Sequence, residues 1–115
     1  MTLDQVKEVK SVLQSDVPSY VSVFAGRIAD TGVDPEPIMA QAVSILKPLP
    51  AAELIWASPR ELINIFQAER IGCQVITVTN DILKKLHLIE YDLNKYSLDT
   101  VKMFYSDAVD AGFKL

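Results

Sequence analysis

The order of a strand followed by a helix recurs three times along this chain, and this recurrence constrains the fold more than any other feature. Runs rich in β-branched and aromatic residues, typical of buried strands, lie at about 19–24, 53–57 and 73–78. Each run is followed by a segment in which apolar residues recur at helical spacing. Strands that alternate with helices form parallel sheets joined by right-handed crossovers. The sequence therefore predicts an α/β fold with about three βα units.

Two of the helices should begin at recognisable caps. Asp34 is the predicted N-cap of one helix, with Pro35 at its first helical position. The segment 58–61 reads SPRE, which has the Ser and Glu of a capping box and again has Pro at the first position. We therefore expect the second of these helices to follow Ser58 directly and to run to about residue 71.

Amphipathic helices are also predicted at the two ends, over 3–13 and over about 98–111. The second has an apolar stripe made of Val101, Phe104, Tyr105 and Ala108. Half of the 115 residues are hydrophobic, a high share for one small domain. The near-continuous apolar run 54–57 suggests burial on both faces, and three strands leave open sheet edges. We expect the chain to bury apolar surface against something outside itself.

Charge and cysteine content exclude several classes of function. With 11 basic and 15 acidic groups the net charge is −4, and no basic cluster exceeds Lys84-Lys85, which argues against nucleic acid or a membrane surface as a partner. The apolar runs are shorter than the ~20 residues needed to span a bilayer, and the first residues do not resemble a signal peptide. The single cysteine, Cys73, excludes an intrachain disulfide and a cysteine-based zinc cluster. We expect a soluble cytoplasmic protein without a metal site.

Ligands of parallel α/β folds bind at the carboxyl ends of the strands, which directs attention to the residues after each strand. Arg27 follows Gly26 off the first strand, and a guanidinium there suits a phosphate or carboxylate. The alternative is an ion pair with Asp30 that only holds the loop. Ser58, at a predicted helix N-terminus, either binds an anion together with the free backbone amides or serves as a cap alone. Arg60 either assists that anion or points to solvent.

The remaining reactive side chains favour structural roles. A Schiff-base lysine needs a desolvated pocket at a strand end, but all eight lysines fall on predicted helices or the tail, so we predict no catalytic lysine. His87 is predicted to lie on the surface, Cys73 to be a small buried residue, and Trp56 to belong to the core or an interface. A flavodoxin-like nucleotide domain, the competing fold, would need two more strands and a Gly-rich loop that the sequence lacks.

Three segments together resemble the C-terminal part of the transaldolase family, especially its short members related to fructose-6-phosphate aldolase. They are residues 21–30, 54–61 and 75–79, and the most specific is GRIAD at 26–30. The resemblance covers nearly the whole chain, from about residue 3 to residue 115. It implies that 1–115 is a single C-terminal portion of a (β/α)₈ TIM barrel, with three βα units and flanking N- and C-terminal helices.

The resemblance also implies a function. Complete family enzymes transfer a dihydroxyacetone unit between sugar phosphates through a lysine Schiff base, in the pentose phosphate pathway and without a cofactor, and the strand that bears this lysine has no counterpart here. What carries over is the phosphate side. Arg27 matches the phosphate-binding arginine and Ser58 a binding serine, with Arg60 beside them. Phe24 stands where aldolase-like members have a tyrosine, and Ser22 matches a position that lines the pocket.

Two expectations follow for this polypeptide. The first is that it binds a sugar phosphate weakly and catalyses nothing alone. The alternative is a non-catalytic assembly module that completes a barrel with copies of itself or with a separate N-terminal chain. That alternative rests on the open sheet edges and on the apolar stripe, since such helices in the family reach neighbouring subunits. The stripe could equally pack on its own barrel.

Overall fold

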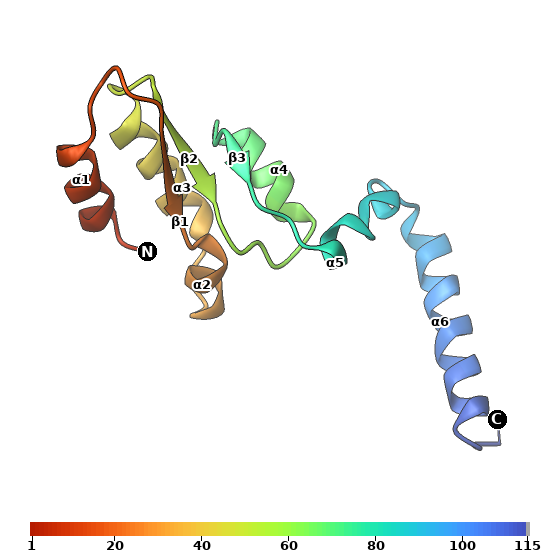
Figure 1. The fold of residues 1–115 in the computed structure, drawn as a ribbon. Coiled ribbons are helices and arrows are strands. Elements are labelled where there is room, and N and C mark those ends of the chain that lie inside the picture. The colour runs from red at the N-terminus through yellow and green to blue at the C-terminus, as the bar shows by residue number, and fades with distance from the viewer. Residues whose placement is uncertain (115) are drawn as a thin grey trace. The chain divides into compact units, whose positions relative to one another are not determined.

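The computed structural model describes residues 1–114, which form a three-stranded parallel sheet with helices (Figure 1). The chain divides into two compact units, Met1–Lys84 and a second that begins at Lys85. The elements of the first unit are α1 (Leu3–Val12), β1 (Ser19–Val23), α2 (Ala25–Asp30), α3 (Pro35–Leu46), β2 (Ala52–Trp56), α4 (Ile63–Arg70), β3 (Val75–Ile76) and α5 (Asn80–Leu83). The second unit contains the short 3₁₀ helix η1 (Leu86–Leu88) and α6 (Leu93–Asp110).

The strands lie in sequence order, with β2 in the middle and both neighbours parallel to it. The register pairs Ser19 with Ala52 at the start of β1 and Val23 with Trp56 at its end. The predicted fold class, an α/β fold with a small parallel sheet, is confirmed. Each strand is followed by a helix because parallel neighbours need a crossover connection.

β3 is much shorter than the predicted run 73–78, because side chains replace part of its ladder with β2. The Leu54 N–H donates to Oε1 of Gln74 at 2.9 Å, and the Leu54 carbonyl accepts from Sγ of Cys73 at 3.2 Å. Backbone pairing therefore begins only at Val75, opposite Ile55.

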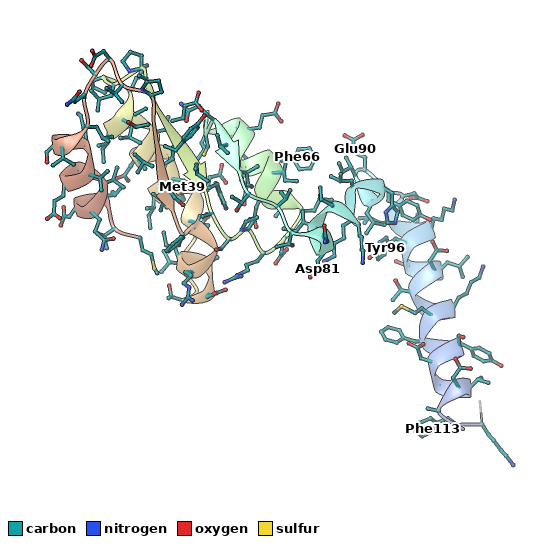
Figure 2. The ribbon with its side chains drawn as sticks, viewed as in Figure 1. Met39, Phe66, Asp81, Glu90, Tyr96 and Phe113 are labelled. Atoms are coloured by element: carbon teal, nitrogen blue, oxygen red, sulfur yellow. The ribbon has the colours of Figure 1, made fainter. Side chains whose placement is uncertain are left out.

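One face of the sheet carries the core of the first unit. Val21 and Val23 of β1 and Trp56 of β2 are buried on this face, together with Met39 of α3, which is fully buried (Figure 2). Other members of the same core cluster are Val6, Ala42, Leu46, Leu54 and Ala68. The helix α3 contacts β2 and also packs against α1 and α4, so it is the central helix of this layer.

The opposite face of the sheet is open. Tyr20 is 67% exposed and Phe24 48% exposed, while Ser22 between them is also exposed. On β2, Glu53 and Ile55 are only partly buried. The expectation that 54–57 is buried on both faces was therefore wrong for Ile55, since the strands alternate between a covered and an open face with the period of two that a strand imposes.

The two predicted caps have different outcomes. Asp34 is the N-cap of α3, accepting from the Glu36 N–H at 3.0 Å, and Pro35 takes the first helical position as predicted. The capping box at 58–61 was wrong, because α4 begins only at Ile63. Oδ1 of Asn64, inside α4, accepts from the N–H groups of residues 60 and 61 and so satisfies amides that a Ser58 cap would have served.

The second unit consists mainly of α6, which starts at Leu93, earlier than the predicted 98–111. Asp92 is the reason: its carboxylate accepts from the backbone N–H groups of residues 94 and 95 and caps the helix. No described residue of α6 is buried, and Phe104 of the apolar stripe is 63% exposed. None of the helices within residues 1–114 has both the length and the apolar character that crossing a membrane requires.

Candidate functional site

Backbone hydrogen bonds join the chain at the carboxyl ends of the three strands. At the end of β1, the Val23 carbonyl accepts from the N–H of Ala57, the residue after β2, at 2.9 Å. The Ala57 carbonyl in turn accepts from the Gly26 N–H at 3.2 Å. Beyond β3, the Thr77 N–H donates to the carbonyl of Trp56 at 3.1 Å. The segments that follow the three strands therefore meet at one edge of the sheet.

Gly26 makes this meeting possible through its lack of a side chain. A Cβ at this position would lie 1.4 Å from the carbonyl oxygen of Ser58 and 2.6 Å from its carbonyl carbon. Backbone atoms cannot yield as a flexible side chain can, so only glycine permits this approach. Arg27, the next residue, is exposed and is thereby held on a segment that touches Ser58.

Ser58 has a left-handed backbone conformation, with φ of +58°. Such a conformation is uncommon outside glycine and is found at tight turns and functional sites. Its N–H donates to Oγ1 of Thr77 at 3.4 Å, which ties the end of β2 to the end of β3. The prediction that Ser58 lies at a helix N-terminus was wrong, because the chain turns at Ser58 and α4 starts five residues later.

Arg60 and Asp30 form an ion pair with two hydrogen bonds. Nη2 of Arg60 donates to Oδ2 of Asp30 at 2.7 Å, and Nε donates to Oδ1 at 3.2 Å. Both side chains are about half exposed, at 49% and 51%. The hydrogen bonds from Arg60 hold the pKa of Asp30 below its usual value, and the charges of Arg60 and Arg27 act in the same direction.

This pair bears on the alternatives left open for the two arginines. Asp30 was one candidate partner for Arg27, but the hydrogen bonds that Asp30 accepts come from Arg60, on the loop after β2. The guanidinium of Arg60 is bound to a carboxylate rather than pointing freely into solvent. The positive charge of Arg27 makes the smallest contribution to the lowered pKa of Asp30, and we call Arg27, Asp30 and Arg60 the charged cluster.

Ser22 and Phe24 occupy a different surface from this cluster. Both lie on β1 or directly after it, on the open face of the sheet, and both are exposed. Ser22 pairs in register with Ile55, one residue before the carboxyl end of β1. The structure therefore brings together the segments that carry Arg27, Ser58 and Arg60 beyond the strand ends, and it leaves the other two predicted residues on the adjoining face.

The other candidate side chains take no part in this cluster. The eight lysines, all within residues 1–114, lie outside the three strands, and Lys10 is the one among them that is half-buried. Cys73 is partly buried, and this burial raises the pKa of its thiol. Trp56 is fully buried in the core, and His87 is exposed. Among residues 1–114, no group of three or more potential metal ligands is close enough to hold an ion.

Two further residues shape this site, and sequence reasoning missed the second of them. Thr77 begins the segment after the third strand, one of the places where the sequence predicts a ligand to bind, but its hydrogen bond with the Ser58 N–H was not predicted. Asn64 gave no such signal, because its role depends on α4 starting at Ile63 and not near residue 59.

Comparison with known proteins gives a consistent result. The model of the family Transaldolase/Fructose-6-phosphate aldolase matches residues 1–115. A probable transaldolase of Nitrosopumilus maritimus (strain SCM1) is 27% identical over 121 residues, which cover 86% of this chain and 54% of the relative. A probable transaldolase of Syntrophomonas wolfei is 30% identical over 90 residues, covering 75% of this chain and 42% of the relative.

The chain thus spans about half the length, or less, of the curated relatives it matches. A third relative, a probable transaldolase of Methanococcus maripaludis (strain C7 / ATCC BAA-1331), is 32% identical over 69 residues, or 59% of this chain and 32% of its own. A family match over every residue, on a parallel α/β fold, leads to one conclusion. The chain belongs to the Transaldolase/Fructose-6-phosphate aldolase family.

Proposed function

We propose that this chain supplies the phosphate-binding side of a sugar-phosphate site, with Arg27 and Ser58 as its principal contacts and Arg60 beside them. Ser22 and Phe24 would line the adjoining surface toward the sugar. In a complete family enzyme, this side would hold the phosphate while a lysine elsewhere forms a Schiff base during transfer of a dihydroxyacetone unit. Cytoplasmic sugar-phosphate metabolism, and the pentose phosphate pathway in particular, is the setting we assign to it.

The close approach of Gly26 to Ser58 is the observation that supports this proposal most directly. It fixes an exposed arginine next to a serine whose backbone has turned out of the strand direction. Guanidinium groups bind phosphate through forked, charge-assisted hydrogen bonds. The cluster is open to water, where charge interactions are weak and screened by salt, so we expect weak binding.

Phosphate binding can be tested by titrating the isotopically labelled chain with fructose 6-phosphate while following the amide signals of Gly26 and Ser58 by NMR. We expect both signals to shift with a common dissociation constant, and Arg27→Gln to weaken binding. Arg70→Gln is the matched control, because Arg70 is paired with Glu36 on other elements. Equal binding by wild type and Arg27→Gln would refute the role of Arg27, and titration with chloride at equal ionic strength controls for salt.

We further propose that the chain alone forms no Schiff base. All its lysines lie outside the strands, and most are exposed, whereas a Schiff-base lysine needs a desolvated pocket. Incubation with fructose 6-phosphate and borohydride, followed by mass spectrometry, should give no covalent adduct. A lysine Schiff-base aldolase treated in parallel is the positive control, and a stoichiometric lysine adduct on this chain would contradict the proposal.

A second candidate function is an assembly module that completes a barrel with another copy or with a separate chain carrying further strands. The observation in its favour is the exposure of large apolar residues on the open sheet face, such as Tyr20 and Phe24, and along α6. Exposed apolar surface of this kind is typical of interaction sites. Light scattering coupled to gel filtration decides, because a stable monomer over a wide concentration range would exclude self-association.

A further inference from the structure

We propose that Asp30 is a positioning residue, which holds the guanidinium of Arg60 beside Arg27 so that both arginines can donate to one phosphate group. Asp30 would act through Arg60 and would not touch the ligand. The inference rests on the proposed phosphate-binding function and extends it to a residue outside the binding contacts.

The geometry of the pair supports this role. Asp30 is the last residue of α2, the helix that begins directly after β1 and contains Arg27. Arg60 lies two residues after Ser58, on the loop that follows β2. Bonds of 2.7 and 3.2 Å between the two side chains therefore connect the two segments whose approach at Gly26 forms the candidate site.

The pair leaves hydrogen-bond donors free for a second anion. A guanidinium has five N–H groups in a rigid fork, and it stays charged at every accessible pH. Asp30 engages the Nε–H and one Nη2–H of Arg60. The remaining N–H groups point away from this carboxylate, because the planar fork fixes their directions. A phosphate could bind there without displacing Asp30.

The charges around Asp30 explain why a carboxylate is needed at this place. Hydrogen bonds from Arg60 join its guanidinium to Asp30, and the positive charges of Arg60 and Arg27 also lower the pKa of this carboxyl. Two like charges repel each other, and a half-exposed arginine without a partner has many rotamers open to it. Asp30 offsets the repulsion and restricts Arg60 to one orientation.

The proposal makes a prediction whose sign differs from that of simple electrostatics. Removing a negative charge next to a phosphate site strengthens phosphate binding if charge alone matters. If Asp30 instead positions Arg60, Asp30→Asn weakens binding, because the amide cannot accept two charge-assisted bonds from the fork. We expect the Kd for fructose 6-phosphate to rise about tenfold, the equivalent of one lost charge-assisted contact. Asp30→Glu should restore part of the affinity.

The structure offers a matched control for this experiment. Glu36 and Arg70 form the same kind of two-bond ion pair in the same unit, with distances of 2.8 and 2.9 Å. Glu36→Gln should leave the Kd unchanged. The measurement is the NMR titration of the whole chain, and Arg60→Lys provides a second variant that keeps the charge but loses the fork. Melting temperatures should change little, since exposed ion pairs contribute little to stability.

Each outcome supports or overturns a defined statement. Weaker binding in Asp30→Asn and Arg60→Lys, with partial rescue by Asp30→Glu, supports the positioning role. Unchanged or tighter binding in Asp30→Asn overturns it, while loss of binding in Arg27→Gln would still uphold the proposed function. An equal loss in Glu36→Gln also overturns it, because the effect would then come from general stability. If the wild type shows no binding at all, the proposed function fails first.

Discussion

Replacement of Gly26 by alanine tests whether the close approach of two backbone segments organises the candidate site. The new Cβ would lie 1.4 Å from the carbonyl oxygen of Ser58. Ordinary contact between such atoms begins near 3.5 Å, so the two segments must separate by about 2 Å. That movement breaks the 3.2 Å hydrogen bond from the Gly26 N–H to the Ala57 carbonyl.

The expected cost follows from three contributions. Forcing extra atoms into a filled space costs about 1–3 kcal/mol, and losing one backbone hydrogen bond costs about 1 kcal/mol. Alanine is a better helix former than glycine, which returns up to about 1 kcal/mol because Gly26 lies within α2. We therefore expect Gly26→Ala to lower the free energy of unfolding by about 1–3 kcal/mol.

Urea denaturation followed by the fluorescence of Trp56 provides the assay, since this is the single tryptophan and it is fully buried in the first unit. Gly32→Ala is the control: Gly32 has a positive φ of 82° but open space around it, so its cost of about 1 kcal/mol comes from backbone strain alone. A Gly26→Ala variant as stable as wild type, or more stable, would refute the reasoning. So would unchanged amide signals at Ser58.

Three further predictions concern stability and reactivity. Met39→Ala should destabilise the first unit by about 2–5 kcal/mol in urea denaturation, because the fully buried side chain would leave a cavity in the core; a smaller loss would mean that the core collapses around it. Burial raises the pKa of the Cys73 thiol, so the folded chain should react with a disulfide reagent at pH 8 more slowly than the chain unfolded in urea. Equal reaction rates of the folded and unfolded chains would contradict this. The stability of the fold should also fall as the pH rises through the thiol pKa. Hydrogen bonds from arginines lower the pKa values of Asp30 and Glu36 in the folded chain. The stability that these carboxylates add is complete above their usual pKa values and is lost as the pH falls through their lowered pKa values in the folded chain. The double variant Asp30→Asn/Glu36→Gln should therefore show a shallower acid transition by circular dichroism.

Local patterns in the sequence were sufficient for the element types and for one cap. Asp34-Pro35 starts α3 in the structure as it does in the pattern, because a cap depends on residues within one turn. The SPRE segment at 58–61 has the same local signature, yet the helix starts at Ile63. At this segment a tertiary contact overrides the local signature. Gly26 approaches the Ser58 carbonyl and Ser58 has a positive φ, so the chain does not enter a helix directly after Ser58.

The sequence by itself determined the order of strands and helices, the parallel sheet and the resemblance to the transaldolase family, because these depend on residue periodicity and on motifs within short segments. Only the tertiary structure decided which arginine binds Asp30 and which residue Gly26 contacts. The two members of the ion pair are 30 residues apart, and Arg27 stands three residues from the same carboxylate. Proximity along the chain favoured Arg27, but the meeting of the strand ends brought Arg60 within hydrogen-bonding distance.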